Sequence, residues 1–163
     1  MRWLLIDEFT EIRKGSLAKG RKCVTRSDEA LTDEFPVFPM VPHPLMCEMM
    51  AQVGGVLVGA TIDFKKEVVL AKITDARFLR PVVPPASLEI EGALTDLGDT
   101  AARTSCLIRS AGEIVAKGDV FFGLFDFLGG SEGRSIVFSE NFMESFAIRE
   151  ILARQAGERT SVS

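Results

Sequence analysis

The sequence has one histidine, three cysteines and no block of lysine and arginine, and each scarcity excludes a class of site. A single histidine argues against a histidine-rich metal centre, so we expect no bound metal. The cysteines lie far apart and are odd in number, which argues against a disulfide framework or a zinc knuckle. We therefore predict a protein with reduced thiols and no cofactor.

The charge balance is mildly acidic, with 19 basic and 23 acidic residues and a net charge of −4. Nucleic acid is not an expected partner, because its binding needs clustered positive charge. The N-terminal segment MRWLLIDEFTE contains only a short apolar stretch, WLLI, whereas a membrane-spanning helix needs about 20 apolar residues. We expect neither a signal peptide nor a membrane span, and we expect a cytoplasmic location.

Length and composition fit one folded domain with an added element. The chain has 163 residues, of which 47% are hydrophobic and 26% are charged, as is typical of a globular protein. The Gly/Ser-rich stretch LGGSEGRSIV at 128–137 indicates a linker. We therefore divide the chain into a main domain over 1–127, this linker, and a helical extension over 138–163 that ends in a disordered tail.

Hydrophobic periodicity predicts an α+β domain with an antiparallel sheet and one apolar helix. The expected strands are 2–14, 16–27, 67–79, 88–97, 100–110 and 113–125, and the expected helix is 43–60. The helix contains Gly54, Gly55 and Gly59, each of which lowers helix stability by up to about 1 kcal/mol. We expect such a helix to form only where the sheet wraps around it.

The stretch SENFMESFAIREILARQ at 139–155 predicts one further helix, with Ser139 as its N-cap. Its apolar stripe consists of Phe142, Met143, Phe146, Ile151 and Leu152. Two roles remain open at this point. The helix packs against its own sheet or that of a partner, or it forms a lid over a ligand channel.

The proline-rich stretch at 35–52 carries a family resemblance. It resembles the hotdog-fold 3-hydroxyacyl-acyl-carrier-protein dehydratases, which have a His-Phe-Pro-Gly loop followed by a helix that opens Pro-Gly-x-Leu-x-x-Glu and continues to Ala-Gln. The matching positions are Phe35, Pro36, Pro39, Pro42, Leu45, Glu48, Ala51 and Gln52. A second stretch, FLRPVVPPASL at 78–88, resembles the family's Phe-x-x-Pro-Val-x-Pro-Gly-Asp-x-Leu segment. The likeness covers about residues 1–126 by element order and leaves out the C-terminal helix.

The resemblance implies a hotdog fold, in which an antiparallel sheet wraps one long central helix, here with an added C-terminal helix. It implies a homodimer, or a higher oligomer of dimers, with an acyl thioester of acyl-carrier protein or CoA entering at the dimer interface. The prolines would hold a loop across the helix N-terminus, where free N–H groups polarise the thioester carbonyl. The implied substrate-binding residues are Phe35, Pro36, Val37 and Gln52.

The chain departs from the family at three positions that bear on catalysis. Glu34 stands where the family has the loop histidine that takes a proton from the carbon next to the thioester. Val37 replaces the loop glycine, and His43 replaces the glycine that opens the helix. Imidazole has a reference pKa near 6.5 against about 4.3 for glutamate, so Glu34 is the weaker base in water. His43 lies about 140° around the helix from Glu48 and could meet it only across a dimer interface.

Glu48 matches the helix acid that, in the family, protonates the departing 3-hydroxyl group. Its neighbours on the helix are mainly apolar, so we expect a desolvated carboxyl group, which favours the protonated form needed of a general acid. Gln52, one turn later, could orient it by a hydrogen bond. The alternative is a glutamate whose tip reaches solvent at the edge of the helix.

Three functions are consistent with these residues. The leading one is a dehydratase-like protein acting on 3-hydroxyacyl thioesters in fatty-acid or polyketide-type synthesis. In it Glu48 is the acid, the N–H group of Val37 binds the carbonyl, and Glu34 or His43 is the base. The second is a thioesterase of the same fold, for which one helix carboxylate suffices. The third is a non-catalytic protein that binds acyl thioesters, working beside an active paralogue.

Overall fold

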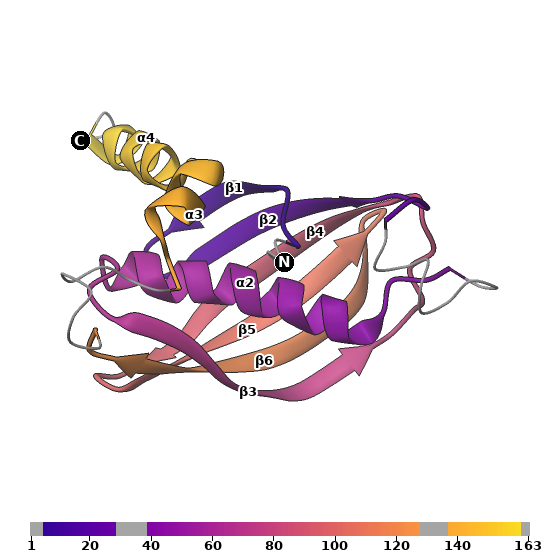
Figure 1. The fold of residues 1–163 in the computed structure, drawn as a ribbon, viewed down its shortest axis with the longest axis horizontal. Helices are drawn as coiled ribbons and strands as arrows, with labels where there is room; N and C mark the ends of the chain where they lie inside the picture. The colour runs from indigo at the N-terminus through magenta and orange to yellow at the C-terminus, as the bar shows by residue number, and fades with distance from the viewer. Residues whose placement is uncertain (1–4, 29–38, 128–136, 161–163) are drawn as a thin grey trace.

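The computed structural model describes residues 5–28, 39–127 and 137–160, and its main body is a curved sheet around one helix (Figure 1). The sheet has six strands in the order β1-β2-β4-β5-β6-β3, and every neighbouring pair is antiparallel. The strands are β1 (Glu8–Arg13), β2 (Leu17–Val24), β3 (Glu67–Phe78), β4 (Ala86–Leu97), β5 (Ala101–Ser110) and β6 (Glu113–Phe125). The predicted α+β class and antiparallel sheet are confirmed.

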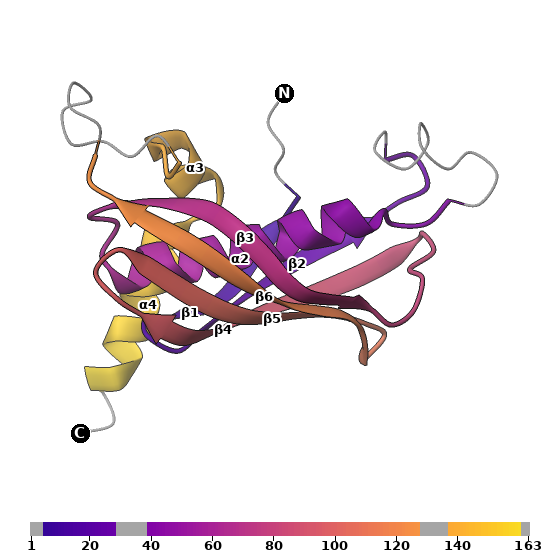
Figure 2. The same ribbon diagram turned by 90° about the horizontal axis from the view of Figure 1, so that it is seen from below.

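Helix α2 (His43–Thr61) lies in the hollow of the sheet, which curves beneath it in Figure 2. Pro44 is tolerated in the first turn because its missing N–H would have no partner within the helix there. The C-terminal half of α2 is buried at every position from Val53 to Ala60. A helix that is apolar all round needs such a covering, so the predicted wrapped helix is confirmed.

Glycines let α2 lie unusually close to the sheet. A Cβ atom on Gly92 of β4 would lie 3.5 Å from the Cα atom of Gly54, so these two backbones are in contact. A Cβ atom on Gly54 would lie 2.6 Å from Oγ1 of the buried Thr104 on β5, which is closer than side-chain atoms tolerate. The absence of a side chain at Gly54 therefore sets the distance between α2 and the sheet.

The C-terminal extension forms two helices, α3 (Glu140–Ser145) and α4 (Ile148–Thr160), so the prediction of one helix over 139–155 is wrong. The chain breaks at Ala147, which has a φ of 48°. The break has a packing reason, because Phe146 and Ile148 are both buried, at 7% and 0% exposure. Residues two apart lie about 200° apart on a continuous helix, so one helix could not bury both.

The extension begins where the described chain resumes after the linker. The main-chain N–H of Val137 donates to the buried carboxylate of Glu67 at 3.2 Å. Ser139 is the N-cap of α3, as predicted, and its hydroxyl accepts from the N–H of Phe142 at 3.3 Å. The rest of the predicted linker and the last three residues of the predicted extension, 161–163, lie outside the described residues, and α4 continues to Thr160, beyond the predicted helix end at 155. No helix in the described ranges is long and apolar enough to cross a membrane.

The extension packs against its own sheet, along the open edge of β1. The ring of Phe146 meets the ring of Phe9 edge-on, with centroids 5.3 Å apart. The side-chain amide of Gln155 faces the main chain of Ile12. With its nitrogen toward the carbonyl group, it donates to the Ile12 oxygen and accepts from the Ile12 N–H at 3.2 Å. Gln155 therefore occupies the position that a neighbouring strand would take at this point of β1.

Candidate functional site

The candidate acid, Glu48, lies on the second turn of α2 and is half-buried. The predicted hydrogen bond is present, because the Gln52 Nε2 atom donates to the Glu48 Oε1 atom at 3.0 Å. The Gln52 Oε1 atom accepts from the main-chain N–H of Leu5 at 3.1 Å. The role of Leu5 could not be predicted from the sequence, because a main-chain donor 47 residues away leaves no pattern in the side chains.

The two stretches that carry the family resemblance meet beside the start of α2. The N–H of Val41, just before the helix, donates to the carbonyl oxygen of Val82 in the β3–β4 connection at 2.8 Å. Both side chains are buried. The Arg26 side chain donates to the carbonyl oxygen of Pro84 in the same connection at 3.2 Å. The entry to α2 is therefore fixed to the sheet by main-chain hydrogen bonding.

His43 is the first residue of α2, and its side chain is exposed. Its ring stacks on the ring of Phe78, with centroids 4.0 Å apart and planes 4° from parallel. Phe78 is the last residue of β3, which is an edge strand of the sheet. In the described part of the chain, no hydrogen bond or ion pair joins His43 to Glu48.

The other predicted site residues, Glu34, Phe35, Pro36 and Val37, lie outside the described residues. The structure therefore brings together Glu48 and Gln52 and places His43 at the start of the same helix. Within the ranges that the structure describes, no group of three or more His, Cys, Asp or Glu side chains could hold a metal ion.

The cysteines near the site are packed thiols. Burial raises the pKa of the Cys47 thiol, which neighbours Glu48 in the sequence and is partly buried. Burial also raises the pKa of Cys106 to about 11, and its Sγ atom donates to the carbonyl oxygen of Met50 at 3.6 Å. Because the thiolate is the nucleophilic form, these shifts disfavour covalent catalysis by either residue.

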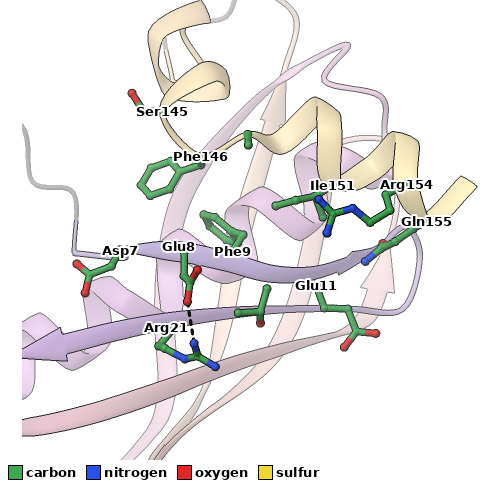
Figure 3. A pocket seen from close by; sticks show the side chains of 12 residues that line it. Asp7, Glu8, Phe9, Glu11, Arg21, Ser145, Phe146, Ile151, Arg154 and Gln155 are labelled. Atoms are coloured by element: carbon green, nitrogen blue, oxygen red, sulfur yellow. Dashed lines mark hydrogen bonds and ion pairs between the residues drawn. The ribbon is translucent and has the colours of Figure 1, made fainter.

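A groove of about 800 Å³ lies between β1 and the C-terminal helices (Figure 3). Phe9, Phe146 and Ile151 supply its apolar surface. At its rim, the Arg21 guanidinium donates to the Glu8 carboxylate at 2.8 Å. Glu48 does not line this groove, so the groove and the candidate acid belong to different regions of the chain.

Sequence comparison assigns most of the chain to one family. The FabA-like domain matches residues 1–121. The FabZ 3-hydroxyacyl-acyl-carrier-protein dehydratase of Herpetosiphon aurantiacus is 33% identical over 125 residues, covering 76% of this chain and 89% of that protein. The FabZ dehydratase of Caldicellulosiruptor bescii is 34% identical over 123 residues, covering 75% and 88%.

Solved structures of similar fold share little sequence with the chain. The smu.793 protein of Streptococcus mutans, bound to acetyl CoA, has a TM-score of 0.64 at 16% identity and covers 77% of this chain and 94% of its own. The thioesterase HI1161 of Haemophilus influenzae has a TM-score of 0.60 at 15% identity, covering 75% and 80%. The dehydratase heterocomplex ApeI:P of Xenorhabdus doucetiae has a TM-score of 0.61 at 16% identity, covering 76% and 84%.

The wrapped helix, the acid on its second turn and the proline segment joined to the β3–β4 connection agree with this match. The chain therefore belongs to the FabA-like family of hotdog-fold proteins, and its curated relatives are FabZ 3-hydroxyacyl-acyl-carrier-protein dehydratases.

Proposed function

We propose that the chain is a dehydratase-like protein that acts on 3-hydroxyacyl thioesters of acyl-carrier protein or CoA. The observation that carries this proposal is the Glu48 carboxyl group on the wrapped helix, which accepts a hydrogen bond from Gln52. The relatives of the chain are FabZ dehydratases. A half-buried carboxyl group with a fixed hydrogen-bond partner suits proton transfer to a bound substrate.

In the proposed reaction, a base removes a proton from C2 of the acyl chain while Glu48 donates a proton to the 3-hydroxyl group. The C3–O bond breaks, water leaves, and the electron pair of the C2–H bond forms the C2–C3 double bond. The N–H group of Val37 would stabilise the negative charge that develops on the thioester carbonyl oxygen as the C2–H bond breaks. Glu34 or His43 would be the base.

The site would be completed by a second copy of the chain that pairs at the β3 edge. Within the described residues, strand β3 pairs only with β6, and its other side is the edge of the sheet. Val69 and Leu70 on this strand are each 43% exposed, which leaves apolar surface for a partner to cover. A His43 side chain stacked at the end of β3 would then lie close to the junction between the two copies.

A thioesterase is the second candidate, and the lack of a loop histidine favours it. The chain has one histidine, and that residue stacks on Phe78 at the start of α2. A thioesterase needs only one carboxylate to attack the thioester carbonyl or to activate water, and Glu48 could supply it. The third candidate, a non-catalytic subunit beside an active paralogue, has a parallel in the heteromeric assembly of the ApeI:P dehydratase.

The deciding experiment is to incubate the purified protein with 3-hydroxyacyl and 2-enoyl thioesters of acyl-carrier protein and of CoA. Interconversion of hydroxyacyl and enoyl forms supports the dehydratase, release of free thiol supports the thioesterase, and binding without turnover supports the non-catalytic subunit. Glu48→Gln should abolish either activity, whereas Glu89→Gln, a change at an exposed glutamate of β4, is the matched control. Full activity of Glu48→Gln would remove Glu48 from the proposal.

A second variant tests whether the residue at position 34 is the base that removes the C2 proton. Glu34→His restores the residue that the family has in its loop, and loss of a general base costs on the order of 10²–10⁴ in rate. We expect dehydration to rise by a factor in that range if Glu34 is a poor base in an otherwise complete site. If the rate stays unchanged, the assignment of position 34 to proton abstraction is wrong.

A further inference from the structure

We propose that the main-chain N–H of Leu5 is a positioning group for the candidate acid Glu48, acting through the side-chain amide of Gln52. The inference rests on the proposed function of Glu48, and it concerns a segment more than 40 residues earlier in the chain. The two hydrogen bonds form a relay from Leu5 N to Gln52 Oε1, and from Gln52 Nε2 to Glu48 Oε1.

The relay depends on the different hydrogen-bonding roles of the oxygen and the nitrogen of the glutamine side-chain amide. Its oxygen only accepts hydrogen bonds and its nitrogen only donates them, so a 180° turn of the group exchanges the two roles with little change in shape. A main-chain N–H is a donor alone. Leu5 therefore selects the orientation in which Gln52 presents its oxygen toward the Leu5 N–H and its nitrogen toward Glu48.

The turned orientation would place the amide oxygen against a carboxylate oxygen, and these two acceptors repel unless Glu48 carries a proton. With the amide fixed, Glu48 keeps one oxygen in a defined hydrogen bond at 3.0 Å. Because the carboxyl group is planar, the second oxygen of Glu48 then also points in a defined direction. The Leu5 N–H thus decides which way the carboxyl group points, without touching it.

The sheet holds Leu5 in place for this role. Its side chain packs against the core, and the next residue, Ile6, is 3% exposed. The N–H of Asp7 donates to the carbonyl oxygen of Arg21 at 2.9 Å, and the Asp7 carboxylate accepts from the N–H of Cys23 at 2.6 Å. The segment before β1 is therefore fixed to β2 two residues beyond the donor, so the Leu5 N–H is pre-organised.

The relay predicts an effect on turnover more than on substrate binding. The hydrogen bond from the Leu5 N–H joins two neutral groups, and its loss carries enough free energy to change a rate by up to about tenfold. Because Leu5 acts in the proposed reaction only through Gln52, the loss of its N–H should lower kcat by about tenfold and leave KM within about twofold. A general loss of folded protein would also lower apparent kcat at unchanged KM, so kcat is calculated per folded molecule.

The test compares Leu5→Pro, which removes the N–H, with Leu5→Ala, which keeps the N–H and removes more of the side chain, so a loss confined to Leu5→Pro does not come from the side chain. The first readout is the side-chain amide of Gln52 in a ¹⁵N–¹H spectrum of the folded protein. It should shift in Leu5→Pro and stay near its original position in Leu5→Ala. The second readout is kcat, with each change also placed in a Gln52→Met background. Leu5→Pro should lower kcat about tenfold further than Leu5→Ala only where Gln52 is present.

A third measurement avoids the proline altogether. Hydrogen exchange of the Leu5 amide should quicken by about tenfold or more in Gln52→Met, which removes its acceptor, and not in the Glu89→Gln control. The spectral and exchange readouts need no turnover, so they judge the relay even if the protein fails as a dehydratase and a thioesterase. Unchanged Leu5 exchange in Gln52→Met, or equal kcat losses with and without Gln52, would overturn the proposal.

Discussion

The substitution Gly54→Ala tests the claim that α2 touches the sheet through its backbone. Two opposing terms decide its effect. Alanine stabilises a helix by up to about 1 kcal/mol relative to glycine. Against this, the added methyl group would lie 2.6 Å from Thr104 Oγ1 and 3.2 Å from the Phe122 ring, and overpacking of a core costs about 1–3 kcal/mol.

The neighbouring glycine provides a matched control. A Cβ atom on Gly55 would meet only the Phe122 ring, at 3.5 Å and beyond, which is ordinary van der Waals contact. Gly55→Ala should therefore gain the helix term without the overpacking term and should stabilise the fold by up to about 1 kcal/mol. Because the helix term is common to both variants, their difference isolates the overpacking term, about 1–3 kcal/mol.

Thermal and urea unfolding of the two variants at one protein concentration measure this difference. For a chain of this size, about 1 kcal/mol moves Tm by about 2–4 °C, so the two variants should melt about 2–12 °C apart. Adding Thr104→Ala to Gly54→Ala removes the nearest atom and should recover part of the loss. If Gly54→Ala is as stable as Gly55→Ala, then α2 can move away from β5 at little cost, and the close-contact argument fails.

Two further predictions concern the buried thiol of Cys106 and the edge of β1 that Gln155 covers. Because burial raises the pKa of Cys106 from its ordinary value of 9.0 to about 11, its contribution to folding is complete below about pH 9 and is lost as the pH rises toward 11. The free energy of unfolding should thus fall less steeply over this range in Cys106→Ala, and an equal slope would show that Cys106 ionises freely in the folded protein. Gln155→Leu should destabilise the fold by about 1–2 kcal/mol, because it leaves the main chain of Ile12 without partners on that side, whereas the adjacent exposed change Arg154→Leu should not. Urea unfolding of both variants measures this, and equal stability would mean that Gln155 does not complete the β1 edge.

The parts of the fold that could be predicted from sequence are those whose pattern is local. The alternation at 88–97 and the glycine-rich apolar stretch at 43–60 correspond to β4 and α2 with small shifts at their ends. The prediction of one C-terminal helix failed because Ile148 was not recognised as core. Its burial depends on contacts made by the rest of the chain, which override local helix preference.

In the candidate site too, only the features that follow a local sequence pattern could be predicted. The spacing of Glu48 and Gln52 predicted their hydrogen bond, because residues four apart lie on one side of a helix. The Leu5 donor could not be predicted, since any residue other than proline offers the same N–H group and only the fold brings it to Gln52. The stacking of His43 on Phe78 likewise joins residues far apart in the chain, so it follows from the path of β3 and not from the helix pattern.

The unequal sides of the sheet limit how copies of the chain can associate. At the β1 side, the Gln155 side chain of α4 takes the place of a neighbouring strand at Ile12, whereas in the described part of the chain the other side of β3 is an open edge. In two copies joined through β3, the outer edges of the combined sheet would be the two β1 strands, each covered by its own α4. Strand-to-strand association would therefore stop at a dimer instead of continuing into a fibre.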